Sequence, residues 1–210
     1  AYEICEGLVG SEMCIRDKGY SIAATIVFTY VGLFGEYAVA GYGSATRIEQ
    51  VVLLPILGIN TAIISIIAQN IGAKYYDRVE QSYFTSIKYG LFIMLIAGVV
   101  IFISADIVPK FFSSNPDVIM HGSMYLKISA FILPAYPIFF LSNGFFMALK
   151  KSEKAMVNNI ARNVIVPVLS FYIAKYLNAD FKTFFYIWAI FQWLISLMLF
   201  FYVKYYIKHK

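Results

Sequence analysis

The stretch QVVLLPILGINTAIISIIAQNIGA, residues 50–73, decides the fold class because it carries no charged side chain. An α-helix rises about 1.5 Å per residue, so about 20 apolar residues cross a hydrocarbon core of about 30 Å. Backbone groups in lipid must be satisfied within their own segment, and the stretch lacks the alternation of a barrel strand. We therefore interpret residues 50–73 as a transmembrane helix.

Uncharged runs of similar length recur along the chain. They cover residues 19–35, 89–105, 128–149 and 183–203, and one further run over 155–174 is interrupted only by Arg162. The sequence therefore predicts an all-α, polytopic helical membrane protein with a bundle of six transmembrane helices.

The composition agrees with a membrane protein. Of the 210 residues, 60% are hydrophobic and 14% are charged, and the mean hydropathy is +0.72. So few charges cannot cover a water-facing surface. The net charge of +5 would also suit nucleic acid, but the basic residues lie between the spans instead of along one solvated face. We expect no nucleic-acid partner.

The basic residues mark every second connection between the spans. The basic-rich set comprises Lys74, Arg78 and Lys88, then Lys150, Lys151 and Lys154, and finally Lys204, Lys208 and Lys210. Connections that are rich in Lys and Arg stay in the cytoplasm. The pattern therefore predicts a multi-pass protein of the plasma or inner membrane whose C-terminus is cytoplasmic.

The first 17 residues, AYEICEGLVGSEMCIRD, differ from the rest of the chain. They hold both cysteines and four of the twelve acidic residues. Residues 13–17 back-translate into DNA that resembles the end sequence of transposase-based sequencing libraries, so we interpret 1–17 as a non-native segment. A genuine loop or amphipathic segment is the alternative. We expect the natural chain to begin earlier, which would make this sequence a fragment.

Polar side chains inside spans are costly in lipid, so they face the bundle interior or a water-filled path. Near and within residues 50–73, at about 100° per residue, one arc of about 120° carries Thr46, Glu49, Gln50, Asn60 and Thr61. For Glu49, a position at the headgroup interface is the open alternative. Pro55 permits a kink in the same helix.

Two later spans carry further features. In the run over 128–149, Pro134 and Pro137 predict a bend that serves alternating access or is simply static shape. The same run contributes Tyr136 and Asn143. In the run over 155–174, we expect Arg162 to reach back to the interface or to cap neighbouring helices.

Signatures of catalysis are missing from the sequence. It contains no HExxH, GxSxG or P-loop motif, and its two histidines, His121 and His209, are expected in a loop and at the tail. No acidic residue is placed unambiguously at mid-membrane, so no proton or sodium relay is evident. We predict that the chain is not an enzyme and holds no cofactor or metal.

Two stretches resemble the multidrug and toxic-compound extrusion (MATE) transporters. The first is AVAGYGSATRIEQVVLLPILGINTAIISIIAQNIGAKYYDRV, residues 38–79, and the second is NGFFMALKKSEKAMVNNIARNVIVPV, residues 143–168. The resemblance extends over residues 19–210 and implies that 18–210 form the C-terminal six-helix lobe of a twelve-helix transporter. The N-terminal lobe of the same chain would then be missing.

The resemblance implies antiport against Na⁺ or H⁺, with two lobes rocking around a cavity and small organic, often cationic and aromatic, compounds expelled. The partners of the chain would then be these compounds, the lipid bilayer and the missing lobe. The essential acids that many members carry in the first lobe are absent here. The candidate cavity residues of this half are Glu49, Gln50, Asn60, Tyr136 and Asn143. The alternatives are a lipid-linked oligosaccharide flippase of the same superfamily and a non-transporting structural subunit of the membrane.

Overall fold

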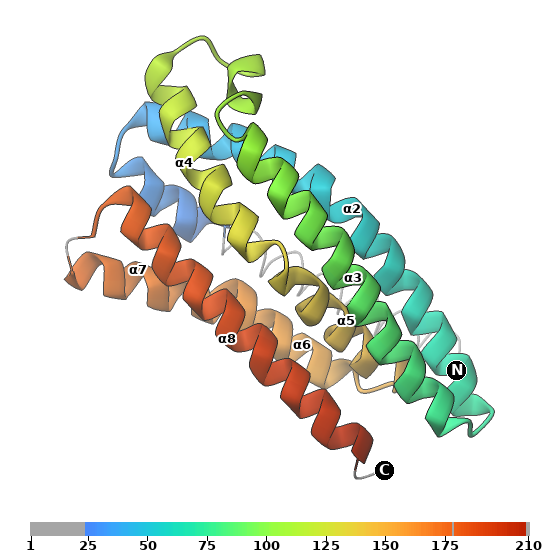
Figure 1. Ribbon diagram of the computed structural model, residues 1–210. Coiled ribbons are helices and arrows are strands. Elements are labelled where there is room, and N and C mark those ends of the chain that lie inside the picture. The colour runs from blue at the N-terminus through green and yellow to red at the C-terminus, as the bar shows by residue number, and fades with distance from the viewer. Residues whose placement is uncertain (1–23, 178, 209–210) are drawn as a thin grey trace, which may run out of the picture.

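The computed structural model describes residues 24–177 and 179–208, and all its regular elements in these ranges are helices (Figure 1). Residues 24–32 form a first helical segment. In chain order, the later elements are α2 (Glu36–Gly72), α3 (Tyr76–Ser104), the 3-10 helix η1 (Val108–Phe111), α4 (Pro116–Ile132), α5 (Ala135–Ala148), α6 (Ser152–Ile160), the π-helical turn η2 (Ala161–Ile165), α7 (Val166–Tyr176) and α8 (Phe181–Lys208).

Five of the six predicted spans lie within the described residues, and all five are helical. α2, α3, the continuous run Ser152–Tyr176 and α8 are each long and apolar enough to cross a membrane, and α4 with α5 does so as a bent pair. The predicted all-α membrane bundle is confirmed. The predicted span 19–35 begins outside the described residues, and so does the whole of the segment 1–17.

The helices extend beyond the uncharged runs. α2 begins at Glu36, so the predicted connection around Arg47 is helical, and α3 begins at Tyr76 and includes Lys88. A charge marks the edge of the hydrocarbon layer, whereas the helical hydrogen bonds continue into the headgroup region. The prediction for His121 is also wrong, because it lies in α4 with its ring 4.8 Å from that of Phe181.

The predicted bend is confirmed between α4 and α5. The two helices meet at 53°, and the break falls at Leu133 and Pro134. Pro134 and Pro137 lack the N–H groups that would continue the helical hydrogen bonds through this region. The bend directs α5 away from the axis of α4 and places Tyr136 directly after the break.

Close helix packing depends on small residues. A Cβ atom added at Gly41 of α2 would lie 2.6 Å from the carbonyl oxygen of Val118 in α4, and one added at Gly98 of α3 would lie 2.9 Å from the carbonyl oxygen of Ala130. Glycine at these contacts allows helix backbones to approach closely, as is common in membrane bundles. α4 therefore lies close to both α2 and α3.

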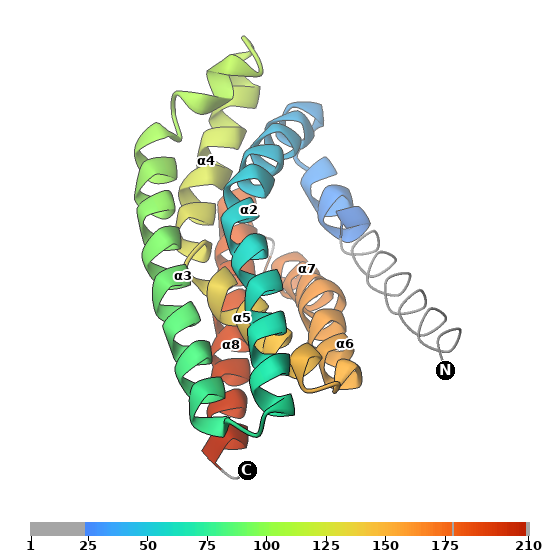
Figure 2. The same ribbon diagram turned by 90° about the vertical axis from the view of Figure 1, so that its right-hand side faces the viewer.

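The basic-rich connections gather at one end of the bundle. The turns after α2 and α5 and the end of α8 lie together, opposite η1 and the turn at 33–35 (Figures 1 and 2). The start of α6 contacts the end of α8, because the Lys151 ammonium lies 4.6 Å from the centre of the Tyr206 ring. This arrangement is the one that the alternating charge pattern requires, although which end faces the cytoplasm stays a prediction.

Candidate functional site

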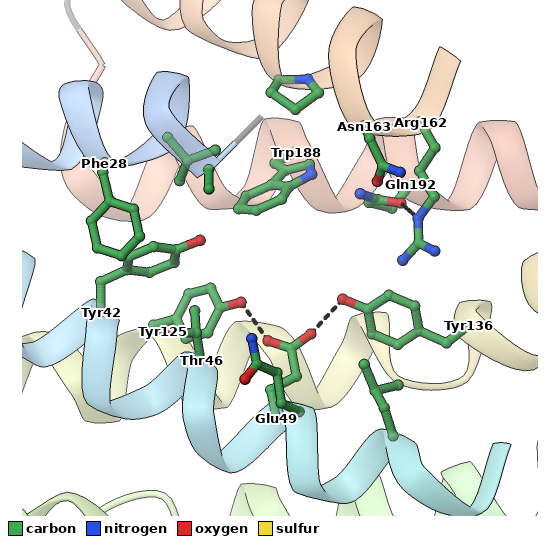
Figure 3. A pocket seen from close by; sticks show the side chains of 15 residues that line it. Phe28, Tyr42, Thr46, Glu49, Tyr125, Tyr136, Arg162, Asn163, Trp188 and Gln192 are labelled. Atoms are coloured by element: carbon green, nitrogen blue, oxygen red, sulfur yellow. Dashed lines mark hydrogen bonds between the residues drawn. The ribbon is translucent and has the colours of Figure 1, made fainter. Parts of the chain in front are cut away.

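A pocket of about 150 Å³ lies between the first helical segment, α2, α4, α5, η2, α7 and α8 (Figure 3). Aromatic and polar side chains share its wall, among them Phe28, Glu49, Tyr125, Tyr136, Arg162 and Trp188. Such a mixture of aromatic surface with a few converging polar groups is typical of small-molecule sites.

Glu49 lies on the inward face of α2. The buried residues of this helix recur every three or four positions, and Glu49 falls between Ala45 and Leu53 in that series. Only 7% of its surface is exposed. Glu49 therefore lies inside the protein and not on its lipid-facing surface.

Two tyrosine hydroxyls hold the Glu49 carboxylate. Tyr125 donates a hydrogen bond to Oε2, and Tyr136 donates one to Oε1. Within the described residues, the ion pair found is that of Lys127 with Asp106, so no described cation balances Glu49 at ion-pair distance. A buried carboxylate without a counter-charge is costly, so a cation bound beside it would be strongly favoured.

Packing fixes the Tyr125 ring in place. It is buried, and its centre lies 4.9 Å from the ring centres of both Tyr42 and Phe185 in edge-to-face contacts. Edge-to-face aromatic pairs are favourable and directional. The hydroxyl that reaches Glu49 is therefore held in a defined position.

Arg162 enters the pocket from the opposite wall, and the prediction that it reaches the interface is wrong. Only 7% of its surface is exposed, and its Nε donates a 2.9 Å hydrogen bond to Oε1 of Gln192. Its guanidinium carbon lies 4.6, 4.4 and 5.0 Å from the ring centres of Tyr136, Phe139 and Phe140. Cation–π contacts with these rings partly replace the lost water.

The backbone around Arg162 is π-helical, which turns its side chain inward. Pro167 lacks an N–H group, and a proline ring conflicts with the carbonyl group four residues earlier, here that of Asn163. Widening the preceding turn into η2, Ala161–Ile165, relieves this conflict. π-helical turns inside α-helices are frequent at functional sites.

The five predicted cavity residues are not all brought together. Glu49, Gln50 and Tyr136 line the pocket. Asn60 instead packs against α5, where a Cβ atom added at Gly144 would lie 2.2 Å from its Oδ1. Asn143 is buried in α5, and neither its Oδ1 nor that of Asn60 has a hydrogen-bond partner among the described residues. The role of all five in binding stays a prediction.

Several pocket residues were missed by sequence reasoning. Tyr125 lies in a stretch that was taken for a connection, so it carried no signal of burial, and Gln192 and Trp188 looked like ordinary members of an apolar span. Arg162 did carry a signal, because a charge inside a span is by default functional. Across the described ranges, no group of three or more His, Cys, Asp or Glu side chains could hold a metal ion.

Comparison with known proteins supplies the family. The MatE family model matches residues 18–172. The chain belongs to the MATE family. The probable multidrug resistance protein YpnP of Bacillus subtilis is 27% identical over 167 residues, which cover 80% of this chain and 35% of that protein. The multidrug export protein MepA of Staphylococcus haemolyticus is 26% identical over 149 residues, which cover 70% of this chain and 33% of that protein.

Solved structures show the same MATE fold. An outward-facing multidrug resistance MATE transporter matches 100% of this chain with a TM-score of 0.91 at 23% identity, and a MOP superfamily transporter from Pyrococcus furiosus matches 99% with a TM-score of 0.91 at 22%. The matched part is 48% of each of those chains. This MATE chain therefore spans about half of the solved transporters and about a third of the curated relatives.

Family membership agrees with the expectation of a multi-pass membrane protein that is not an enzyme. A further relative, the FAD transporter of Shewanella oneidensis, is 23% identical over 145 residues, covering 69% of this chain and 32% of that protein. The relatives favour neither the oligosaccharide flippase nor the structural subunit.

Proposed function

We propose that residues 18–210 form the C-terminal lobe of a MATE-type exporter that expels organic compounds in exchange for Na⁺ or H⁺, with Glu49 as the residue that binds the coupling cation. The N-terminal lobe of the same chain would complete the cavity. Two points support this arrangement: the chain covers 48% of solved MATE-fold transporters, and two of its relatives are named for multidrug resistance or export.

The observation that carries the proposal is the buried Glu49 carboxylate, held by two hydroxyls and balanced by no described cation at ion-pair distance. A cation that binds beside such a group offsets the cost of its buried charge. A cationic group on a substrate would gain from the same carboxylate. Competition of the coupling cation and the substrate for one acid would couple their movements, because each would displace the other.

The remaining predicted residues take different places in this proposal. Gln50 and Tyr136 would contact the substrate directly, since both line the pocket. Asn60 packs against Gly144 of α5, and Asn143 is buried in α5. Both would join the path when the lobes move and the helices separate. The protein would reside in the plasma or inner membrane with its C-terminus in the cytoplasm.

Transport by the full-length protein in proteoliposomes tests the proposal. Ethidium efflux should follow an imposed Na⁺ gradient or pH gradient, and which gradient drives it identifies the coupling ion. Glu49→Gln should abolish the gradient-driven component. The matched control is Glu36→Gln, an exposed acid in the first turn of the same helix, which should transport normally. Gradient-driven efflux by Glu49→Gln at the rate of the unmodified protein would refute the assignment.

A further inference from the structure

The pocket contains hydrogen-bond donors that nothing in the described protein satisfies. A guanidinium carries five N–H bonds. Of those on Arg162, the Nε–H reaches Gln192, whereas the two terminal amino groups make no hydrogen bond within the described ranges. Figure 3 shows these amino groups directed into the space between η2, α2 and α5. The indole N–H of Trp188, another pocket residue, is likewise buried without a described partner.

No described acid neutralises Arg162. Glu49 is the other buried charged residue of the described chain, and the two are not within ion-pair distance of each other. The rings of Tyr136, Phe139 and Phe140 stack against the guanidinium but supply no lone pairs for its amino groups. A buried cation of this kind is stabilised strongly by an oxyanion, which can accept two parallel hydrogen bonds from the guanidinium.

Tyr136 sets the separation of the two charges. Its hydroxyl donates to Glu49, while its ring faces the guanidinium carbon of Arg162 at 4.6 Å. The carboxylate and the guanidinium thus contact the same aromatic side chain within one pocket (Figure 3). A ligand that satisfies both would carry a cation and an oxyanion, and an aromatic body would suit the aromatic wall of the pocket.

We infer that Arg162 is the anion subsite of the pocket, so that the transported compounds include aromatic zwitterions whose ammonium group binds Glu49 and whose carboxylate or phosphate binds Arg162. The inference rests on the proposed function in one respect, that the pocket is the substrate site. The ammonium group would displace the coupling cation from Glu49, while Arg162 would contribute binding that a purely cationic compound cannot use.

Two compounds of nearly equal shape isolate the anion subsite. 4-(Aminomethyl)benzoate carries both charges at opposite ends of a benzene ring, and 4-(aminomethyl)benzamide replaces the carboxylate with a neutral amide. Titration calorimetry on the full-length protein in detergent micelles should show the benzoate binding at least about tenfold more tightly, as expected when an oxyanion accepts charge-assisted hydrogen bonds. Equal affinities for the unmodified protein would overturn the inference without any variant.

Substitution of Arg162 tests whether its guanidinium produces the preference for the benzoate. Arg162→Gln should reduce the ratio of the benzoate affinity to the benzamide affinity to less than about twofold, and Arg162→Lys should retain part of the preference. Lys175→Gln, an exposed basic residue of α7, should keep the full preference. A full preference in Arg162→Gln would overturn the inference. Benzamide binding also reports that each variant is folded.

The two proposals fail in different ways. If ethidium efflux is independent of every cation gradient but the benzoate preference depends on Arg162, the coupling role of Glu49 is wrong and the anion subsite stands. If gradient-driven efflux depends on Glu49 but benzoate and benzamide bind equally, the exporter assignment stands and the anion subsite is wrong.

Discussion

Glu49 and Arg162 both contact Tyr136. The Tyr136 hydroxyl donates a hydrogen bond to Glu49, and the centre of its ring lies 4.6 Å from the guanidinium carbon of Arg162. Tyr136 is the second residue of α5, just after the break from α4. The side chain that contacts both buried charged residues of the pocket therefore lies beside the bend.

Removal of either tyrosine hydroxyl should weaken the hold on the Glu49 carboxylate, because each hydroxyl donates a hydrogen bond to one of its oxygens. For Tyr125→Phe and Tyr136→Phe we expect gradient-driven ethidium efflux to fall, since the acid proposed to bind the coupling cation is less well positioned. Each variant should also lose about 1–3 kcal/mol of stability through the lost hydrogen bond to a charged group. The measurement is gradient-driven efflux from proteoliposomes, with thermal unfolding in parallel.

The matched control for these variants is Tyr83→Phe. The Tyr83 hydroxyl is fully buried and forms a 2.6 Å hydrogen bond with the Ser142 hydroxyl, away from the pocket. This variant should lower stability and leave gradient-driven efflux in place. An equal fall in efflux in all three variants would show that general loosening of the bundle, and not the environment of Glu49, causes the loss.

The sequence predicts those features of the fold that follow from the need to satisfy backbone hydrogen bonds in lipid. Uncharged runs located the spans, and the missing N–H groups of Pro134 and Pro137 located the bend, since both are local consequences of backbone hydrogen bonding. Helix ends were misjudged around Arg47, because a charge limits the hydrocarbon layer and not the helix.

The site was less accessible to sequence reasoning than the spans. The position of Glu49 on the polar arc of α2 indicated a cavity, but its hydroxyl partner Tyr125 comes from a helix that was taken for a connection. The orientation of Arg162 depends on a π-helical turn, and no residue pattern distinguishes such a turn from an ordinary helix before the fold is known.

Close approach of α2 and α4 makes Gly41 intolerant of a larger side chain. A Cβ atom there would lie 2.6 Å from the Val118 carbonyl oxygen and 2.9 Å from the Gly122 nitrogen, both in the backbone. We expect Gly41→Val to cost about 1–3 kcal/mol or more, as overpacking does elsewhere. Thermal unfolding in detergent measures the loss. Gly58→Val, in the same helix but with nothing within 4 Å, is the control; equal losses in the two variants would contradict the close contact.

Asp106 should make the stability of the protein depend on pH under acidic conditions. Its carboxylate accepts hydrogen bonds from the Lys127 ammonium, at 2.8 Å, and from the Ser123 hydroxyl, and these lower its pKa from the ordinary value of 3.8. A folded-state pKa below the unfolded one stabilises the protein above the unfolded pKa, and this stabilisation is lost as the pH falls through the folded pKa.

The unfolding temperature of the unmodified protein should therefore exceed that of Asp106→Asn near neutral pH, and the two should converge below about pH 4, where the carboxyl of the unfolded chain is protonated. The difference should be small, because 62% of the Asp106 side chain is exposed and water screens the pair. Glu153→Gln, another exposed acid, is the control. A constant difference between Asp106→Asn and the unmodified protein at every pH would exclude the ion pair as its cause.

Single cysteines at the two ends of the bundle determine its orientation. Residues 18–210 contain no cysteine. In a full-length protein whose native cysteines are all replaced by serine, Glu153→Cys at the start of α6 and Ser114→Cys before α4 therefore provide unique labels. Because the basic-rich turn after α5 should be cytoplasmic, a membrane-impermeant maleimide applied to intact cells should label position 114 and spare position 153. Lysis should expose position 153. Labelling of 153 in intact cells would invert the topology and place the C-terminus outside.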